Sequence, residues 1–179
     1  GRTVTFLGRL SVEKGPRFLV DAWGQIADRH PDWRLRFVGS GPDEDAVRSR
    51  VARLPAGADR VEFVPPVADV EPELRAAGVL ALPSLTEGLP MSLAEAMAMG
   101  QATVSADCSA GVRALTDDGR VGRIVPRGDA DALAVALDAL LGDDAERARL
   151  GAAARAHVER YRLPTVIDAW EQLIADTLR

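Results

Sequence analysis

Short apolar runs alternate along the chain with longer segments in which apolar residues recur every three or four positions. The runs have the length of buried strands, and the longer segments have the spacing of helices that bury one face. Such alternation is typical of βα units around a parallel sheet. The expected strands are residues 3–7, 35–38, 61–64, 79–82, 102–105 and 123–125, and the helices between and after them are 16–29, 43–53, 70–77, 90–99, 110–115 and 130–141.

Two further helical segments follow with no strand between them. They cover residues 145–160 and 165–178, and Pro164 marks the break because proline cannot continue a preceding helix. Right-handed crossovers then predict an α/β fold: a doubly wound, Rossmann-like parallel sheet of about six strands with two C-terminal helices. Its ligand crevice is expected at the carboxyl ends of the strands.

Composition indicates a single domain with a buried core. The chain has 179 residues, of which 47% are hydrophobic, and no apolar run reaches the eighteen or so residues of a membrane span. The single cysteine, Cys108, excludes an internal disulfide and is interpreted as a small packing residue. His30 and His157 are expected at the surface, and Trp23 and Trp170 in packed positions. The absence of a signal-peptide pattern and of disulfides favours a cytoplasmic setting.

The charges argue against a general nucleic-acid binder and single out one residue. The net charge is −5 and the sequence pI is about 5.1, whereas nucleic-acid binding needs a basic face. Of the 22 basic residues, Lys14 is the only lysine. Because lysine and arginine are not interchangeable, a lone lysine hints at the need for a compact ammonium, although an arginine-biased genome explains it equally well.

Two glutamates flank the start of one predicted helix. Glu87 lies in a turn, and Glu95 lies inside the helix that Pro90 can begin at its first position. Leu89 is a poor N-cap, so the amides of residues 91–93 lack a side-chain acceptor and can bind an anion. With a rise of about 1.5 Å per residue, Glu95 is roughly 7 Å along the helix from Pro90. This span suits a nucleotide diphosphate with a hydroxyl-rich group at each end.

Two cations and a glycine turn are expected on the same crevice edge. Arg9 and Lys14 follow the first strand, where they could balance a diphosphate leaving group. Gly39 follows the second strand, and either a tight turn or close approach of backbone to a ligand explains it. The order Lys14, Gly15, Pro16 is not that of a P-loop, which needs Ser or Thr after Gly-Lys.

These segments together resemble the retaining glycosyltransferases with the GT-B fold, the group 1 family with an E-x7-E motif. The resemblance covers nearly the whole chain. It is carried by GRLSVEKG at residues 8–15, VGSGP at 38–42, PSLTEGLPMSLAE at 83–95 and DGRVGRIVPRGD at 118–129. It implies that residues 1–179 form a single donor-binding domain, the C-terminal half of a two-domain enzyme whose N-terminal acceptor domain is absent.

The resemblance also implies roles for individual residues. Arg9 and Lys14 would hold the donor phosphates, and Glu87 would contact the sugar hydroxyls without acting as a nucleophile. The remaining donor contacts would come from Glu95 at the ribose, from the backbone at Gly39, from the amides of Gly88, Leu89 and Met91, and from the backbone of Val64 and Pro65 at the base. No cofactor and no metal ion are implied, and the expected donor is a UDP-linked sugar.

Two departures from the family pattern keep other interpretations open. Pro90 stands where many relatives have a glycine, and Ala114 stands where many have a glutamate. The alternatives are half of a sugar-nucleotide epimerase and a non-catalytic nucleotide-sugar-binding module. The family interpretation predicts a hexosyltransferase domain that binds donor, lacks transfer activity without its N-terminal lobe, and forms a homodimer through the apolar stripe of its terminal helix.

Overall fold

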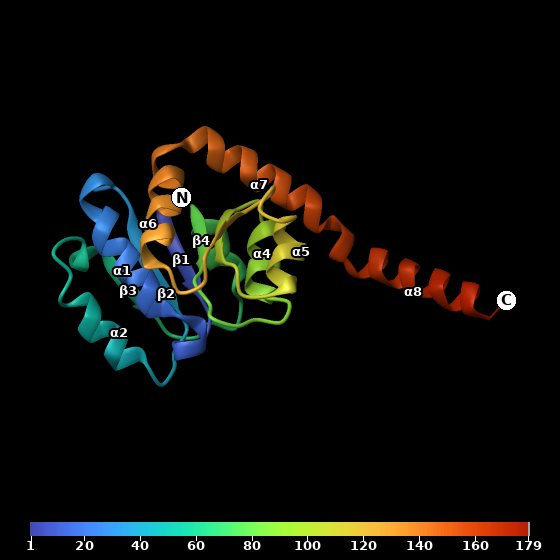
Figure 1. Cartoon of the computed structure of the whole chain (residues 1–179), viewed down its shortest axis with the longest axis horizontal. Helices are drawn as coiled ribbons and strands as arrows, with labels where there is room; N and C mark the ends of the chain where they lie inside the picture. The colour runs from blue at the N-terminus through green and yellow to red at the C-terminus, as the bar shows by residue number, and fades with distance from the viewer. Residues whose placement is uncertain (179) are drawn as a thin grey trace.

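The computed structural model describes residues 1–178 and contains one six-stranded parallel sheet (Figure 1). The strand order is β3-β2-β1-β4-β5-β6. This order confirms the predicted doubly wound α/β fold. Four strands have the predicted bounds and two are one residue longer: β1 (Thr3–Leu7), β2 (Arg34–Val38), β3 (Val61–Val64), β4 (Val79–Leu82), β5 (Ala102–Ala106) and β6 (Arg123–Val125).

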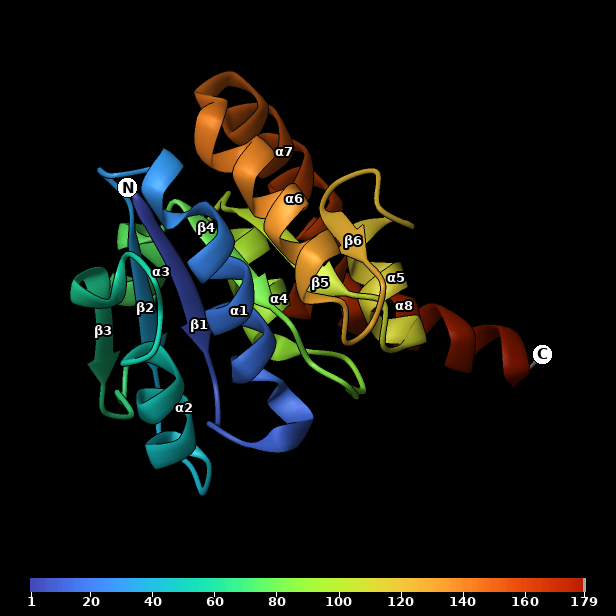
Figure 2. The same ribbon diagram turned by 60° about the vertical axis from the view of Figure 1, so that its left-hand side comes forward.

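Helices cover both faces of the sheet (Figure 2). The first apolar core lies under α1 (Pro16–Ile26), α2 (Glu44–Val51) and α6 (Ala130–Gly142). The second core lies under four helices on the opposite face: α3 (Glu71–Ala76), α4 (Met91–Ala98), α5 (Ala110–Thr116) and α7 (Asp144–Val158). Both faces of the central strands are therefore buried, which explains why β4 and β5 carry almost no exposed residue.

Caps and fully buried aromatic residues fix the helix positions. Asp129 accepts a hydrogen bond from the amide of Ala132, 2.8 Å away, and so caps α6. Trp23 in α1 is fully buried, as predicted, and its indole donates to the carbonyl of Gly57 at 3.1 Å. The predicted helix 16–29 ends as an α-helix at Ile26 and continues as a 3-10 turn at Ala27–Arg29.

The sequence predictions for Pro90, His157 and His30 were wrong. Pro90 is the N-cap of α4 and not its first helical residue, because its ψ of 108° is extended and the helix begins at Met91. His157 is only 9% exposed, since its ring packs inward and hydrogen-bonds the carbonyl of Ala114 at 2.9 Å. The His30 side chain is also largely covered and lies 2.7 Å from a carboxylate oxygen of Asp138.

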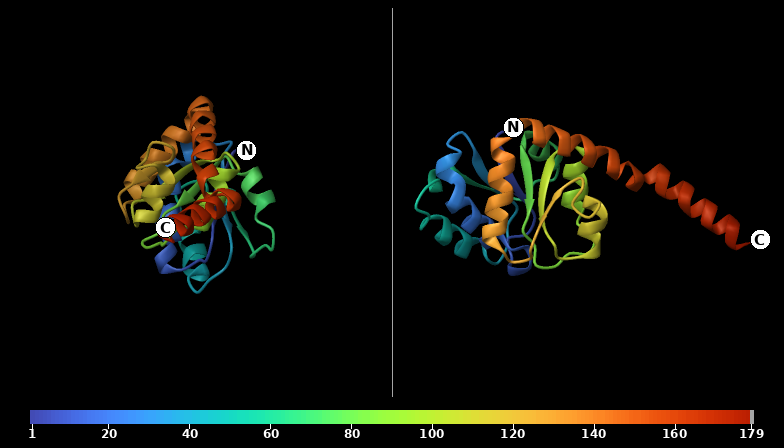
Figure 3. Two further views of the ribbon diagram at one scale, coloured as in Figure 1. Left: turned by 90° about the vertical axis from the view of Figure 1, so that its right-hand side faces the viewer. Right: turned by 45° about the horizontal axis from the view of Figure 1, so that its top comes forward.

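The last helix, α8 (Leu163–Thr177), extends away from the rest of the chain (Figure 1 and Figure 3). It contains no buried residue, and its main neighbour is the 3-10 turn at Glu159–Tyr161. Trp170, expected in a packed position, is 61% exposed. The stripe is amphipathic as the sequence indicates, but nothing within residues 1–178 covers it. Within the same residues, no helix has the length and apolar character needed to cross a membrane.

Candidate functional site

Loops at the carboxyl ends of three neighbouring strands meet in close backbone contact. The amide of Gly8, after β1, donates to Val38 at the end of β2, and the amide of Gly39, after β2, donates to Val64 at the end of β3. Gly39 has a φ of 134°, and a Cβ there would lie 2.1 Å from the carbonyl oxygen of Gly8. Only glycine fits this position. Gly39 therefore allows the close approach of two loops, and contact of its backbone with a ligand stays a prediction.

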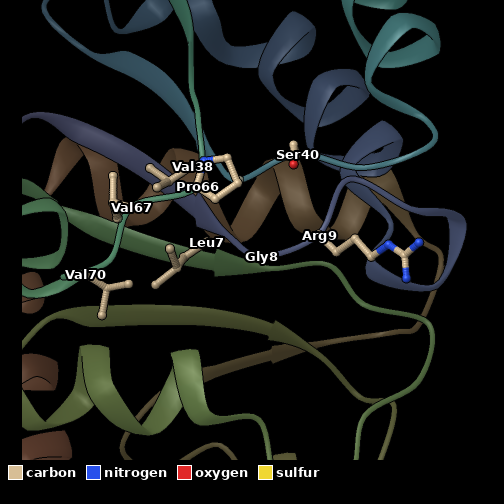
Figure 4. A pocket seen from close by; sticks show the side chains of 9 residues that line it. Leu7, Gly8, Arg9, Val38, Ser40, Pro66, Val67 and Val70 are labelled. Carbon is tan, nitrogen blue, oxygen red and sulfur yellow. The ribbon is translucent and has the colours of Figure 1, made fainter.

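A cavity of about 280 Å³ opens beside these loops (Figure 4). Its walls are mainly apolar side chains from the ends of β1 and β2 and from the segment after β3, and Ser40 adds a hydroxyl. The apolar residues are Leu7, Val38, Pro66, Val67 and Val70. The predicted base contacts at Val64 and Pro65 lie directly before two residues that line this cavity, Pro66 and Val67. Leu7 and Val38, which also line the cavity, were not singled out from the sequence, although each is the last residue of a strand before a glycine.

Lys14 and Glu87 form an ion pair between two loops that are distant in sequence. The Lys14 Nζ atom lies 2.7 Å from Oε1 and 2.9 Å from Oε2 of Glu87. The Glu87 side chain is 7% exposed and that of Lys14 is 34% exposed. Ser84, which is fully buried, donates its hydroxyl to Oε1 of Glu87 at 2.7 Å. The carboxylate is thus held by two side chains, which satisfies most of its acceptor capacity despite burial.

A second close backbone approach brings the two loops of this ion pair together. Gly15 follows Lys14 with a φ of 64°, and a Cβ there would lie 2.3 Å from the carbonyl oxygen of Pro83. The amide of Leu85 donates to the carbonyl of Glu13 at 2.7 Å. The loop after β1 and the loop after β4 are therefore packed directly against each other, which places Lys14 beside Glu87.

Arg9 belongs to the same loop as Lys14 but points elsewhere. Its side chain extends away from the apolar walls of the 280 Å³ cavity (Figure 4). Arg9 is exposed and makes no hydrogen bond or ion pair with any side chain in the described part of the chain. The structure thus brings Lys14 and Glu87 together and leaves Arg9 as a solvated cation on the rim.

The start of α4 presents free backbone amides. Pro90 offers no side-chain cap, and within residues 1–178 the amides of Gly88, Leu89 and Met91 have no acceptor. Gly88 and Leu89 are exposed, and a Cβ on Gly88 would meet no heavy atom within 4 Å. These amides and the positive end of the helix can bind an anion.

The loop at Gly88 is supported from behind by α5. Ser109, the N-cap of α5, donates its hydroxyl to the carbonyl of Gly88 at 3.1 Å and accepts the amide of Val112. Gly111 packs so closely that a Cβ on it would lie 2.0 Å from the same carbonyl oxygen. The segment after β5 therefore determines how the exposed amides are presented.

Glu95 lies in the second turn of α4 and is separate from the ion pair. It is half-buried, and no side chain of residues 1–178 donates to its carboxylate. Burial raises the pKa of Glu95 above its ordinary value, because desolvation penalises the charged form. Glu95 lines a second, largely apolar cavity of about 360 Å³ between α4, the end of α7 and the start of α8.

Cys108 packs beside the second core, as expected of a small packing residue. Burial raises the pKa of its thiol, and the charge of Glu87 adds to this effect. Within residues 1–178, no group of three or more His, Cys, Asp or Glu side chains is placed to hold a metal ion.

A doubly wound parallel sheet with an uncapped helix start at its carboxyl edge defines a Rossmann-like domain. The family model for glycosyl transferases group 1 matches residues 1–143, so the chain belongs to this family of GT-B glycosyltransferases. The family predicted from the sequence motifs is thereby confirmed.

Several known proteins are similar to the chain. A phosphatidyl-myo-inositol mannosyltransferase of Mycolicibacterium smegmatis is 41% identical over 165 residues, which cover 90% of this chain and 42% of the mannosyltransferase. HepE of Anabaena, crystallised with UDP, is 27% identical with a TM-score of 0.84 over 99% of this chain and 48% of its own. The C-terminal domain of a Francisella tularensis group 1 glycosyltransferase has a TM-score of 0.81 at 23% identity, over 90% of this chain and 86% of that domain. The chain spans about half or less of the length of the curated relatives.

The contact between α5 and the exposed loop yields a prediction for a matched pair of glycines. Gly111→Ala should destabilise the fold by about 1–3 kcal/mol, because its Cβ meets backbone that must shift. The melting temperature should fall by roughly 2–4 °C per kcal/mol. Gly88→Ala, whose Cβ enters open space, should melt like the wild type in the same thermal scan. Equal melting temperatures for the two variants would show that α5 does not press on the loop.

Proposed function

We propose that this domain binds the nucleotide-diphosphate sugar of a retaining glycosyltransferase. The observation that carries the proposal is the Lys14–Glu87 ion pair beside the uncapped start of α4, at the carboxyl edge of the sheet. The crystallisation of HepE with UDP supports a UDP-linked donor. The name of the mycobacterial relative, a mannosyltransferase, supports a hexose as the transferred group.

The positive charges of the site account for recognition of the diphosphate. Lys14 uses two N–H groups on Glu87 and keeps a third for a phosphate oxygen. Arg9 on the rim and the amides of Gly88, Leu89 and Met91 supply further donors. These groups balance the charge that develops on the leaving diphosphate, so the proposed reaction needs no metal ion.

The two carboxylates take different roles in this proposal. Glu87 is almost fully covered and already accepts hydrogen bonds from Lys14 and Ser84, so it positions the sugar and does not attack it. The acceptor hydroxyl then attacks on the face from which the diphosphate leaves, and the departing phosphate takes the proton. Glu95 is unpaired and half-buried, which suits an acceptor for ribose hydroxyls. The apolar 280 Å³ cavity suits the flat base.

The proposed partner is the remaining half of the enzyme. The chain spans 42% of the mycobacterial mannosyltransferase, so the acceptor-binding part is expected outside it. Without that lobe, half a cleft cannot orient the attacking hydroxyl or exclude water, and we expect donor binding without transfer. A cytoplasmic setting stays a prediction of the sequence.

Replacing Lys14 tests recognition of the diphosphate. Lys14→Ala should weaken UDP binding by roughly ten- to a hundred-fold, since one charge-assisted contact contributes about 1.5–3 kcal/mol. Titration calorimetry measures the change, and a thermal scan checks that the variant folds. The control is Arg53→Ala, which removes an exposed cation after α2 and should bind as the wild type does. A chelator should leave UDP binding unchanged. Retained affinity in Lys14→Ala, or a strict need for Mg²⁺ or Mn²⁺, would contradict the proposal.

The ribose role of Glu95 predicts a dependence on sugar hydroxyls and on pH. UDP should bind more tightly than its 2′-deoxy analogue, and Glu95→Gln should reduce this preference. The ionised carboxylate accepts the hydroxyl protons, and its pKa is raised above the ordinary value of about 4.3. The affinity of the wild type for UDP should therefore fall as the pH is lowered through this raised pKa. The UDP affinity of Glu95→Gln should not show this fall. Equal binding of UDP and deoxy-UDP by the wild type would make Glu95 a structural residue.

The uncovered helix α8 predicts self-association when the rest of the enzyme is absent. Five large apolar side chains on α8 are at least 44% exposed, and such surfaces associate in water: Leu163, Ile167, Trp170, Leu173 and Ile174. Sedimentation should show a concentration-dependent homodimer for the 179-residue chain and a monomer for a chain that ends at Arg162. Because α8 has no buried residue, the shortened chain should keep its melting temperature. A full chain that stays monomeric at high concentration would exclude this dimer.

A further inference from the structure

We propose that Ser84 is a positioning residue of the donor site, which holds Glu87 so that one defined lone pair faces the sugar. This inference rests on the proposed function of the domain. Ser84 lies two residues after Leu82, the last residue of the central strand β4, and its side chain is completely buried. Its hydroxyl oxygen lies 2.7 Å from Oε1 of Glu87.

The geometry of Lys14 alone does not fix the carboxylate. The ammonium nitrogen is almost equidistant from the two oxygens of Glu87, at 2.7 and 2.9 Å, so the carboxylate can tilt about this contact without losing it. Ser84 contacts only Oε1 and removes that freedom. A carboxylate has about four acceptor positions. Lys14 and Ser84 occupy three of them, which leaves the open position on Oε2.

A purely structural role would give Ser84 a different partner. A serine in a turn commonly bonds the backbone two or three residues ahead. Within residues 1–178, the hydroxyl of Ser84 instead makes its hydrogen bond to the side chain of Glu87. The buried hydroxyl therefore serves the orientation of Glu87.

The test separates recognition of the sugar from recognition of the diphosphate. The 179-residue chain and Ser84→Ala are titrated with UDP and UDP-glucose, or with GDP and GDP-mannose if the wild type prefers guanine. Ser84→Ala should lose roughly three- to ten-fold in affinity for the nucleotide sugar, the size of one hydrogen bond, and less than about two-fold for the diphosphate. In a Glu87→Ala background, Ser84→Ala should cause no further loss, because the residue acts through Glu87.

Two further variants control for packing. Ser105→Ala removes another fully buried hydroxyl, one that has no hydrogen-bond partner within residues 1–178, and should leave both affinities unchanged. Ser84→Cys keeps a weaker donor and should bind the nucleotide sugar with intermediate affinity. If Ser84→Ala lost equal affinity for the nucleotide sugar and the nucleoside diphosphate and had a lower melting temperature, Ser84 would have a structural role and the inference would be overturned. An unchanged affinity for both ligands would also overturn it. A wild type that binds none of the four ligands would refute donor binding itself, and the inference with it.

Discussion

Close backbone contact between loops at the carboxyl edge of the sheet is the constraint on which the site depends. A side chain on Gly39 would collide with Gly8, and one on Gly15 would collide with Pro83. These contacts bring the ends of β1, β2 and β4 within hydrogen-bonding distance of one another's loops. Because the parallel sheet aligns all strand ends at one edge, a few such approaches suffice to place residues that are far apart in sequence.

A partly buried ion pair is consistent with a need for lysine at position 14. The Nζ atom of Lys14 contacts both oxygens of a carboxylate that is 7% exposed, in a space bounded by Ser84 and the packed loops. A compact ammonium can serve two oxygens and still keep one proton for a ligand. The longer, planar guanidinium spreads its donors over a wider fork. The geometry therefore favours the need for a compact ammonium, and not an arginine-biased genome, as the reason for a lysine at position 14.

The sequence predicts local structure well and contacts between segments poorly. The strand bounds follow from short apolar runs between turns, and the motifs single out Lys14 and Glu87 as candidate site residues. Their pairing spans 73 residues and depends on the approach of Gly15 to Pro83, which no local pattern encodes. His157 was misjudged for the same reason, since its partner is the carbonyl of Ala114 on another helix. Trp170 lies on the amphipathic stripe that the sequence indicates, but it is 61% exposed and nothing within residues 1–178 covers it.

The exposed helix α8 shares a cavity with Glu95, one of the two candidate site carboxylates. Val166, in the first turn of α8, lines the same 360 Å³ cavity as the unpaired carboxylate of Glu95. Any change in the direction of α8 therefore alters the solvation of Glu95. If Glu95 binds the ribose, free-energy linkage makes the effect reciprocal: a partner that fixes α8 changes nucleotide affinity by the same factor by which nucleotide changes affinity for the partner. A helix that looks like a mere appendage would then be a thermodynamic coupling element.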